Sequence, residues 1–224
     1  MDQASERAAH QTPDAPGDSA RPPAPRPARL LPSRRRILQG AALAAVPSAL
    51  LTSPHAVAKT RRAAAYPPVE WAPASSSNYT ASNRPSSYPI AYVVVHVTQE
   101  TYADTLAIFK NPAKKVSAHY VVRSTDGHIA QCVSERNVAW HAGNWTYNTR
   151  SIGIEHEGWV DQPEYFTDAM YEQSALLTAA ICDKYAIPKD RQHIIGHVEV
   201  PGTDHTDPGR YWDWSRYIRM VNSV

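Results

Sequence analysis

One stretch of the sequence reads as a buried β-strand, and the predicted fold is built around it. It runs Tyr88-Pro89-Ile90-Ala91-Tyr92-Val93-Val94-Val95-His96-Val97-Thr98. The β-branched residues follow one another without the polar alternation of a half-buried strand. A run of this kind is typical of a strand that is covered on both faces by other elements. The stretch therefore predicts a sheet that lies inside the domain.

His96 lies near the end of this predicted strand. A histidine in this position is either a core residue whose ring is hydrogen-bonded or a ligand of a metal ion. The strand taken alone favours the core residue. If the chain supplies further metal ligands, the interpretation of His96 as a ligand becomes the favoured one. The other histidines and carboxylates of the sequence therefore decide between the two roles.

A second stretch gathers histidines and carboxylates into one loop after a short apolar run. It reads Ile194-Ile195-Gly196-His197-Val198-Glu199-Val200-Pro201-Gly202-Thr203-Asp204-His205-Thr206-Asp207-Pro208-Gly209. Pro208 favours an extended Asp207, so the turn holds the Asp207 carboxylate in a fixed direction. A zinc site takes about three protein ligands and leaves one position open for water. His197 and Asp207 are candidates for two of them, and His96 then becomes the candidate for the third.

The elements around these two stretches alternate between helix and strand. Tyr102, Leu106 and Phe109 fall at helical spacing, and Asp126-Gly127 predicts the turn of a hairpin. The predicted elements after the first strand are a helix over 99–110, strands over 116–123, 128–133 and 151–158, a helix over 167–185, a strand over 193–195 and a helix over 211–221. This order predicts an α/β fold: a single domain with a central mixed β-sheet flanked by helices, after an export signal.

The predicted strand over 151–158 carries two carboxylates. Side chains alternate along a strand, so Ile152 and Ile154 share one face, while Glu155 and Glu157 share the other with Gly153. Taken alone, the pattern indicates only a half-buried strand.

An aromatic loop precedes that strand and reads Trp140-His141-Ala142-Gly143-Asn144-Trp145. Aromatic rings beside polar groups suit contact with a sugar or a peptide, although such tryptophans as often serve packing. Trp140, His141 and Asn144 are therefore candidate substrate-binding residues.

Residues 1–58 read as a leader. Residues 1–32 are rich in proline, alanine and charge, which is typical of disorder. The segment 33–51 joins a run of arginines to a short apolar run, and Ala56-Val57-Ala58 offers a cleavage site. The pattern predicts an export signal that resembles the twin-arginine type, with an ordinary Sec signal or an uncleaved anchor as the alternative. We expect a secreted protein of the cell wall, without stable membrane association after cleavage.

The rest of the chain divides into a linker or N-terminal wrap over 59–84 and one domain over 85–224. The leader holds 7 of the 23 Lys and Arg and 4 of the 21 Asp and Glu, which leaves 16 against 17 in the remainder. This balance gives no reason to expect a nucleic-acid partner. We expect a monomer.

The chain has two cysteines, Cys132 and Cys182. In an exported protein an even pair favours a disulfide, and two buried free thiols are the alternative. The disulfide is the prediction.

Five motifs stand in a familiar order: Val94-Val95-His96-Val97-Thr98, Ser117-Ala118-His119-Tyr120, Trp140-His141-Ala142-Gly143, Ser151-Ile152-Gly153-Ile154-Glu155, and Gly196-His197 with Asp207-Pro208-Gly209. Together they resemble the zinc-dependent N-acetylmuramoyl-L-alanine amidases. These are the type 2 amidases, related to phage lysozyme-amidases and to peptidoglycan recognition proteins. Five motifs in one order are much more specific than any one of them alone.

The resemblance implies a zinc ion held by His96, His197 and Asp207, and it implies Glu155 as the catalytic carboxylate. In some relatives a tyrosine directly before the histidine of the second strand takes part instead. This chain has Ala118 at that position, which agrees with the branch that uses the glutamate.

The sequence departs from the family pattern at His205, because many relatives carry lysine two residues before the last ligand. We expect His205 to donate a hydrogen bond to the oxyanion. The alternative is that His205 binds the zinc while Asp207 only shapes the turn. The motif around His119 adds that residue to the candidate substrate contacts.

The implied reaction is hydrolysis of the amide bond between N-acetylmuramic acid and L-alanine in bacterial peptidoglycan, and the choice of bond rests on the resemblance. One alternative is a non-catalytic peptidoglycan-binding module, which would have no need of three ligands and Glu155. Another is a zinc peptidase that cuts within the stem peptide. The sequence has no His-Glu-x-x-His helix, which weakens the common peptidase interpretation.

Overall fold

The computed structural model describes residues 63–224, and its centre is a six-stranded sheet. The strands are β1 (Glu70–Trp71), β3 (Tyr92–Val97), β4 (Tyr120–Val122), β5 (Ile129–Gln131), β7 (Ser151–His156) and β8 (Ile194–Gly196). Their order in the sheet is β1-β5-β4-β7-β3-β8. β3 is parallel to β7 and β8, and β4 is parallel to β7 but antiparallel to β5. The sheet is mixed, which confirms the predicted fold class.

β3 is the buried strand that the sequence predicts. It lies between β7 and β8, and Val93, Val94 and Val95 are completely buried. Val93 and Val95 pack in the large core cluster together with α3 (Asp168–Tyr185) and α4 (Trp214–Ser223). Val94 instead packs in a separate small cluster with Ala142, Ile195 and Val200. Alternate side chains of β3 therefore face the helical core and the opposite side, where His96 also lies.

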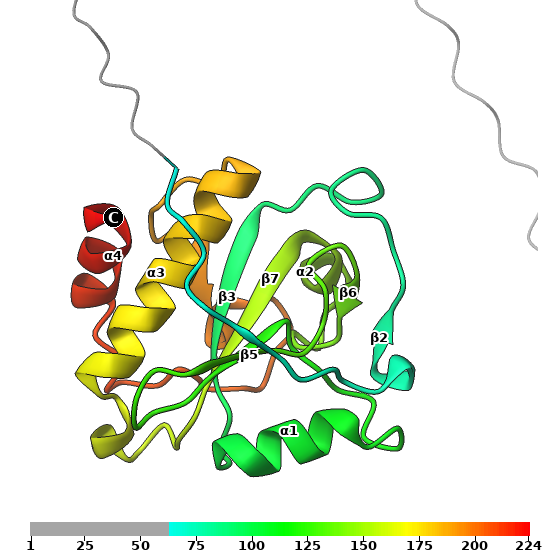
Figure 1. Cartoon of the computed structure of the whole chain (residues 1–224), viewed down its shortest axis with the longest axis horizontal. Coiled ribbons are helices and arrows are strands. Elements are labelled where there is room, and N and C mark those ends of the chain that lie inside the picture. The colour runs from blue at the N-terminus through cyan, green and yellow to red at the C-terminus, as the bar shows by residue number, and fades with distance from the viewer. Residues whose placement is uncertain (1–62) are drawn as a thin grey trace, which may run out of the picture. The chain divides into compact units, whose positions relative to one another are not determined.

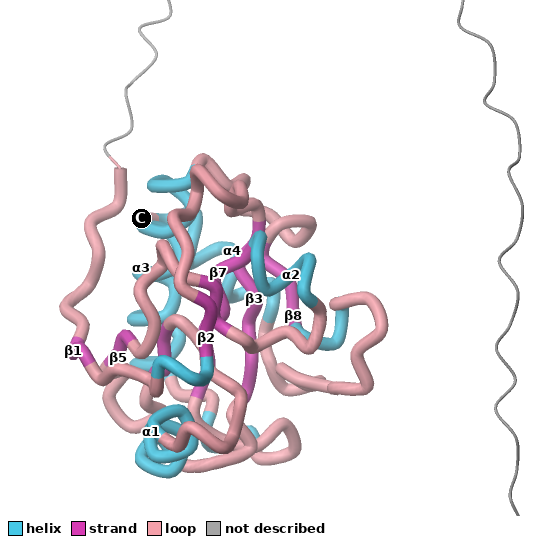
Figure 2. The backbone as a smooth tube through the Cα atoms, turned by 90° about the vertical axis from the view of Figure 1, so that its right-hand side faces the viewer, coloured by secondary structure: helices cyan, strands magenta, loops and turns pink. Residues whose placement is uncertain are grey.

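Helices cover both faces of the sheet. α3 and α4 pack side by side over one face (Figure 1). α1 (Tyr102–Lys110) covers part of the other face, where Tyr102 and Phe109 pack with Val121 and Ala130. Figure 2 shows β3, β7 and β8 next to one another, with α1 at one end of the domain.

Each of the four α-helices within residues 63–224 begins at a side chain that accepts a backbone N–H, as capping residues do, and Asn144 has this role for α2 (Trp145–Arg150). Thr101 caps α1, Thr167 caps α3 and Asp213 caps α4. The predicted helix over 99–110 therefore begins later, because Gln99 has a φ of 55° and Thr101 is the cap. α2 (Trp145–Arg150) is absent from the prediction, since six residues are too few to show a clear period.

Residues 63–84 pack on the domain. β1 pairs with β5, and β2 (Tyr79–Thr80) forms a second small sheet with β6 (Val138–Ala139). Arg84 is 4% exposed, and its guanidinium donates to the backbone carbonyls of Glu135, Asn148, Thr149 and Ser151. Three short 3-10 helices complete the described elements: η1 (Ser76–Asn78), η2 (Pro163–Tyr165) and η3 (His197–Glu199).

The predicted disulfide is wrong, because Cys132 and Cys182 are both free and buried. Cys132 belongs to the cluster that packs against α1, and Cys182 to the cluster around α3 and α4. The sheet separates the two thiols, and each behaves as a small apolar side chain. The predicted export segment, residues 1–58, lies outside the described residues. Within residues 63–224, no helix combines the length and apolarity that a membrane crossing requires.

Candidate active site

The candidate site lies at the carboxyl ends of three adjacent parallel strands. His96 is the last residue but one of β3, Glu155 is the last but one of β7, and His197 directly follows β8. His96 and Glu155 are partners in the β3–β7 register. Ligand sites of open α/β sheets gather at such strand ends. The parallel pairing thus brings three distant motifs to one place.

His96, His197 and Asp207 form a compact group whose ligand atoms all lie within 4.8 Å of one another. Their exposed fractions are 2%, 3% and 4%. The Nδ1 atoms of His96 and His197 lie 3.3 and 3.2 Å from the two carboxylate oxygens of Asp207. Two imidazoles and one carboxylate are a donor set that suits zinc and leaves a coordination position open. The residues present therefore fit that ion.

Backbone contacts fix Asp207. The Val97 N–H donates to Asp207 Oδ2 at 3.3 Å, and the Asp207 carbonyl accepts from the Val198 N–H at 2.9 Å. Pro208 packs onto Gly196, where a Cβ would come within 2.6 Å of the proline ring. Burial opposes ionisation of Asp207, but its contacts with two imidazoles outweigh burial and hold the pKa below its usual range. Asp207 is thus in the ionised form that a metal ligand requires.

Glu155 faces the same space. Its Oε2 atom is buried and has no hydrogen-bond partner among residues 63–224. Burial, and then the charge of Asp207, raises the pKa of Glu155 well above its usual range. A cavity of about 680 Å³ opens here, lined by His96, His141, Glu155, His197, His205 and Asp207 among others. A carboxyl group with these properties in a cavity is suited to accept a proton and return it.

Glu157, on the same face of β7 by sequence alternation, has a different role. Its two oxygens accept from the Tyr102 N–H at 2.9 Å and the Ser124 N–H at 2.8 Å. It therefore binds the start of α1 to the loop after β4, and it does not line the cavity. The two glutamates that the sequence places together separate into a candidate catalytic group and a structural one.

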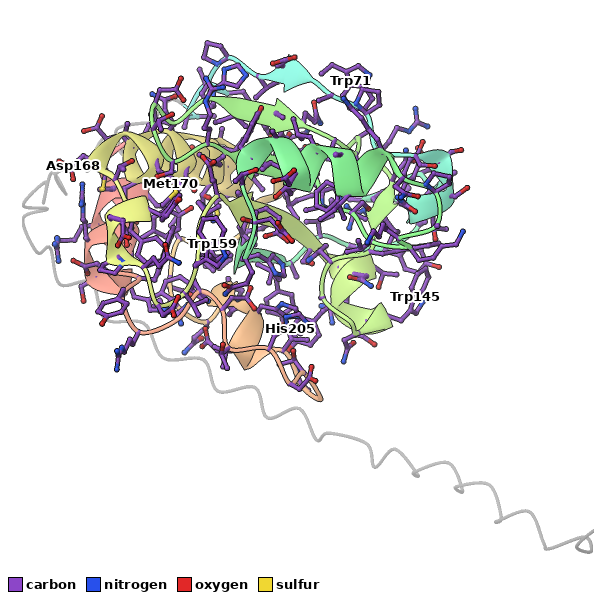
Figure 3. The ribbon with its side chains drawn as sticks, turned by 90° about the horizontal axis from the view of Figure 1, so that it is seen from below. Trp71, Trp145, Trp159, Asp168, Met170 and His205 are labelled. Atoms are coloured by element: carbon purple, nitrogen blue, oxygen red, sulfur yellow. The ribbon has the colours of Figure 1, made fainter. Side chains whose placement is uncertain are left out.

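His205 lies on the loop after β8, near the edge of the domain in Figure 3. Its ring stacks on that of His197, with centroids 4.1 Å apart and planes inclined by 25°. Its Nδ1 atom is 3.4 Å from Asp207 Oδ1, and its side chain is 61% exposed. The compact ligand group contains Asp207 and not His205. This arrangement favours the interpretation that His205 lies beside the ligand group as a hydrogen-bond donor over the interpretation that His205 is itself a ligand.

Two of the four predicted substrate contacts do not reach the cavity. Trp140 and His141 line it. His119 is completely buried, where its Nδ1 accepts from the Gly153 N–H, so it cannot contact a substrate. Asn144 caps α2 through its side-chain oxygen, and its amide donates to the Pro201 carbonyl. The prediction for His119 is therefore wrong, whereas Asn144, which is half-buried and does not line the cavity, stays a prediction.

Sequence reasoning missed several residues that line the cavity. Asn148 lies there, and its Oδ1 accepts from the backbone N–H groups of His141 and Ala142. Finding it would have required the prediction of α2. Thr105 and Ile108 of α1 also line the cavity, with Lys115 beyond the helix. The helical spacing in the sequence predicts only that α1 packs on the domain. It contains no sign that these residues line a site.

The comparisons with known proteins identify the family of the chain. The Amidase_2 family model, described as N-acetylmuramoyl-L-alanine amidase, matches residues 86–210. N-acetylmuramoyl-L-alanine amidase A of Achromobacter lyticus is 39% identical over 170 residues, which cover 68% of this chain and 92% of that protein. The 1,6-anhydro-N-acetylmuramyl-L-alanine amidase AmpD of Haemophilus influenzae is 41% identical over 114 residues, which cover 48% of this chain and 59% of that protein.

These relatives overturn the predicted location. The prediction of a secreted protein in the cell wall is wrong on this comparison, because the matches include AmpD, a cytoplasmic enzyme, beside the secreted Achromobacter amidase. The relatives thus occupy more than one compartment.

A solved structure supports the family assignment. The crystal structure of a selenomethionine derivative of AmpD matches with a TM-score of 0.58 and 30% identity, over 71% of this chain and 98% of that one. The family match spans more than half of the chain and includes the three strands and the loop that build the site. The chain therefore belongs to the N-acetylmuramoyl-L-alanine amidases, hydrolases that cleave an amide bond in peptidoglycan.

Proposed function

We propose that this chain hydrolyses the amide bond between N-acetylmuramic acid and L-alanine with the help of a zinc ion held by His96, His197 and Asp207. One observation carries the proposal. The three-ligand group and Glu155, whose buried Oε2 has no partner among the described residues, share one cavity. Family membership supplies the substrate class, and the geometry of the cavity supports hydrolysis assisted by a metal ion and Glu155.

The side chains divide the work. A zinc ion bound to the three ligands would polarise the scissile carbonyl and lower the pKa of water toward ~7. Glu155 accepts a proton from the attacking water and returns it to the alanine nitrogen, which then leaves as an amine. Its raised pKa suits the second step, because a weak acid retains the proton until the nitrogen can take it.

His205 completes the proposed reaction. Its exposed ring lies over His197 at the cavity, where it can reach a substrate oxygen. An imidazole N–H in this position donates a hydrogen bond to the oxygen that gains negative charge, whether the ring is neutral or protonated. Lysine in relatives would do the same through its ammonium group.

Trp140 is the proposed contact for the sugar or the peptide. Its indole Nε1–H donates to Thr80 Oγ1 at 3.0 Å, so the polar end of the ring is satisfied and the ring is held at the cavity wall. An aromatic surface with a few fixed polar groups suits a ligand that carries both apolar and polar parts.

The proposed catalytic unit is residues 85–224, with residues 59–84 as its N-terminal wrap. The cavity is built by one chain, so a monomer suffices for the reaction.

Product analysis tests the proposal. Purified peptidoglycan is digested with the protein, with the protein and a chelator, and with the chelated protein after zinc is restored. We expect new amino ends on L-alanine that vanish with chelator and return with zinc. A protein that binds peptidoglycan but releases no new ends would be a binding module. New amino ends inside the stem peptide would show a peptidase.

A further inference from the structure

The ring of His96 has a second hydrogen-bonded partner that the proposed reaction does not use. Its Nδ1 atom faces Asp207, while its Nε2 atom lies 2.9 Å from His141 Nδ1. His141 Nε2 lies 3.1 Å from Ser151 Oγ, and Ser151 Oγ donates to the Tyr147 carbonyl at 2.6 Å. A continuous row of hydrogen bonds thus runs from His96 to the Tyr147 carbonyl in α2.

The last bond of this row sets the direction of all the others. A carbonyl oxygen can only accept a hydrogen bond, so the Ser151 hydroxyl donates its one proton to the Tyr147 carbonyl. The same hydroxyl must then accept the hydrogen bond from His141 Nε2–H. A neutral imidazole has one N–H, which leaves a lone pair on His141 Nδ1. That lone pair accepts from His96 Nε2–H. The remaining nitrogen of His96, Nδ1, therefore carries a lone pair that points toward Asp207.

The strand is shaped to hold this row. Ser151, Gly153 and Glu155 share one face of β7 by alternation. A Cβ at Gly153 would come within 2.5 Å of the His141 ring, so only glycine leaves room for that ring above the strand. Asn148 Oδ1 accepts from the His141 N–H at 3.0 Å and so fixes the backbone that carries the ring. His141 is 6% exposed and Ser151 is completely buried, so the row is shielded from water.

We propose that His141 and Ser151 are positioning residues that fix the tautomer of His96 and present its Nδ1 lone pair to the metal ion. The Nδ1 atom of His96 and the Asp207 carboxylate lie 3.3 Å apart. In the metal-free protein a proton on Nδ1 would bond to Asp207, and the row opposes this by keeping the proton on Nε2. A cation between the two atoms is attracted by both the Nδ1 lone pair and the carboxylate. The row thereby favours binding of the ion. His197 has no equivalent support within residues 63–224, since its Nε2 is buried without a hydrogen-bond partner. The inference rests on the metal centre of the proposed function.

Ser151→Ala tests the proposal in the full 224-residue chain. It removes the acceptor for His141 Nε2 and leaves every proposed ligand in place. Ser117→Ala is the matched control, because Ser117 is also completely buried and its hydroxyl bonds only to the backbone of Asn78 and Trp140. Thermal unfolding checks that both variants are folded. Zinc affinity is measured by competition with a chromophoric chelator, and nitrogen NMR of the histidine rings reports the tautomers in metal-free protein.

We expect His96 in the metal-free wild type to carry its proton on Nε2. Ser151→Ala should shift the His96 tautomer and weaken zinc binding on the order of 10-fold, as loss of a group that orients a metal ligand does. Ser117→Ala should change neither quantity. A wild-type His96 protonated on Nδ1, or a folded Ser151→Ala variant with the affinity and tautomer of the wild type, would overturn the inference. A wild type that binds no zinc but has the expected tautomer would instead refute the proposed metal centre alone.

Discussion

His96 on β3 and Glu155 on β7 are register partners in two parallel strands. Partners in neighbouring strands point to the same face of a sheet, so the candidate ligand and the candidate catalytic carboxylate stand next to each other. The same register pairs Val93 with Ile152 and Val95 with Ile154, all buried in the large core cluster. A slip of one residue would expose those apolar side chains. The core therefore fixes the geometry of the site.

Glu155 should be needed for turnover but not for metal binding. Glu155→Gln keeps the size of the side chain but cannot take a proton. We expect a folded, zinc-binding protein whose rate of release of L-alanine ends from peptidoglycan falls on the order of 10²-fold or more. Turnover and zinc content are measured on the same preparation. A variant with nearly normal turnover would remove Glu155 from the mechanism.

Glu157→Gln should show the opposite pattern. Glu157 accepts two backbone N–H groups, from Tyr102 and Ser124, and an amide oxygen replaces only one of its two acceptors. We expect a loss of about 1–3 kcal/mol in the free energy of unfolding, with turnover per folded molecule close to wild type. Denaturant unfolding gives the first quantity and an assay at saturating zinc gives the second. Equal losses of turnover from the two glutamine variants would mean that the choice between the glutamates is unfounded.

Glu155 should also make the stability of the metal-free protein depend on pH. Burial and the charge of Asp207 raise its pKa well above the ordinary value of 4.5. Between these two pKa values the folded state binds one proton more than the unfolded state, so the free energy of unfolding falls as pH rises. With chelator present, Glu155→Gln should therefore unfold at a higher temperature than wild type near pH 7. The difference should shrink as the pH falls from the raised pKa toward 4.5, and it should vanish below that value, where both states of the wild type are protonated. Identical melting curves at pH 7 would contradict the raised pKa.

His205 should affect turnover without holding the metal. His205→Ala removes an N–H donor beside the cavity, and loss of one oxyanion donor typically lowers turnover by about 10²–10³-fold. His205→Lys should recover part of that loss, because an ammonium group also donates. Steady-state rates for the three proteins on the same peptidoglycan decide this. Full activity in His205→Ala would exclude the donor role.

The fold was predictable from the sequence where local patterns are strong. The apolar run that contains Val93 to Val95 indicates a doubly covered strand, and the turn at Asp207 indicates a fixed carboxylate. Placing His96, His197 and Asp207 together required the parallel pairing of β3 with β8, which no local pattern contains. Only the resemblance to the family motifs indicated that these three residues form one site.

The errors have a common physical cause. His119 and Cys132 are ordinary core residues in this fold, and a side chain's burial depends on tertiary packing that the sequence does not display. His141 shows the same limit in another way. It reads as a substrate contact, yet its ring nitrogens bond to His96 and Ser151.

The zinc content of three purified proteins tests the metal centre most directly. Wild type, Asp207→Ala and His205→Ala are loaded with zinc, dialysed and analysed for bound metal per chain. The geometry of the compact group predicts one zinc ion per chain in wild type and in His205→Ala, and loss of the ion in Asp207→Ala. Retention of zinc in Asp207→Ala together with its loss in His205→Ala would contradict the proposed centre and exchange the roles of the two residues.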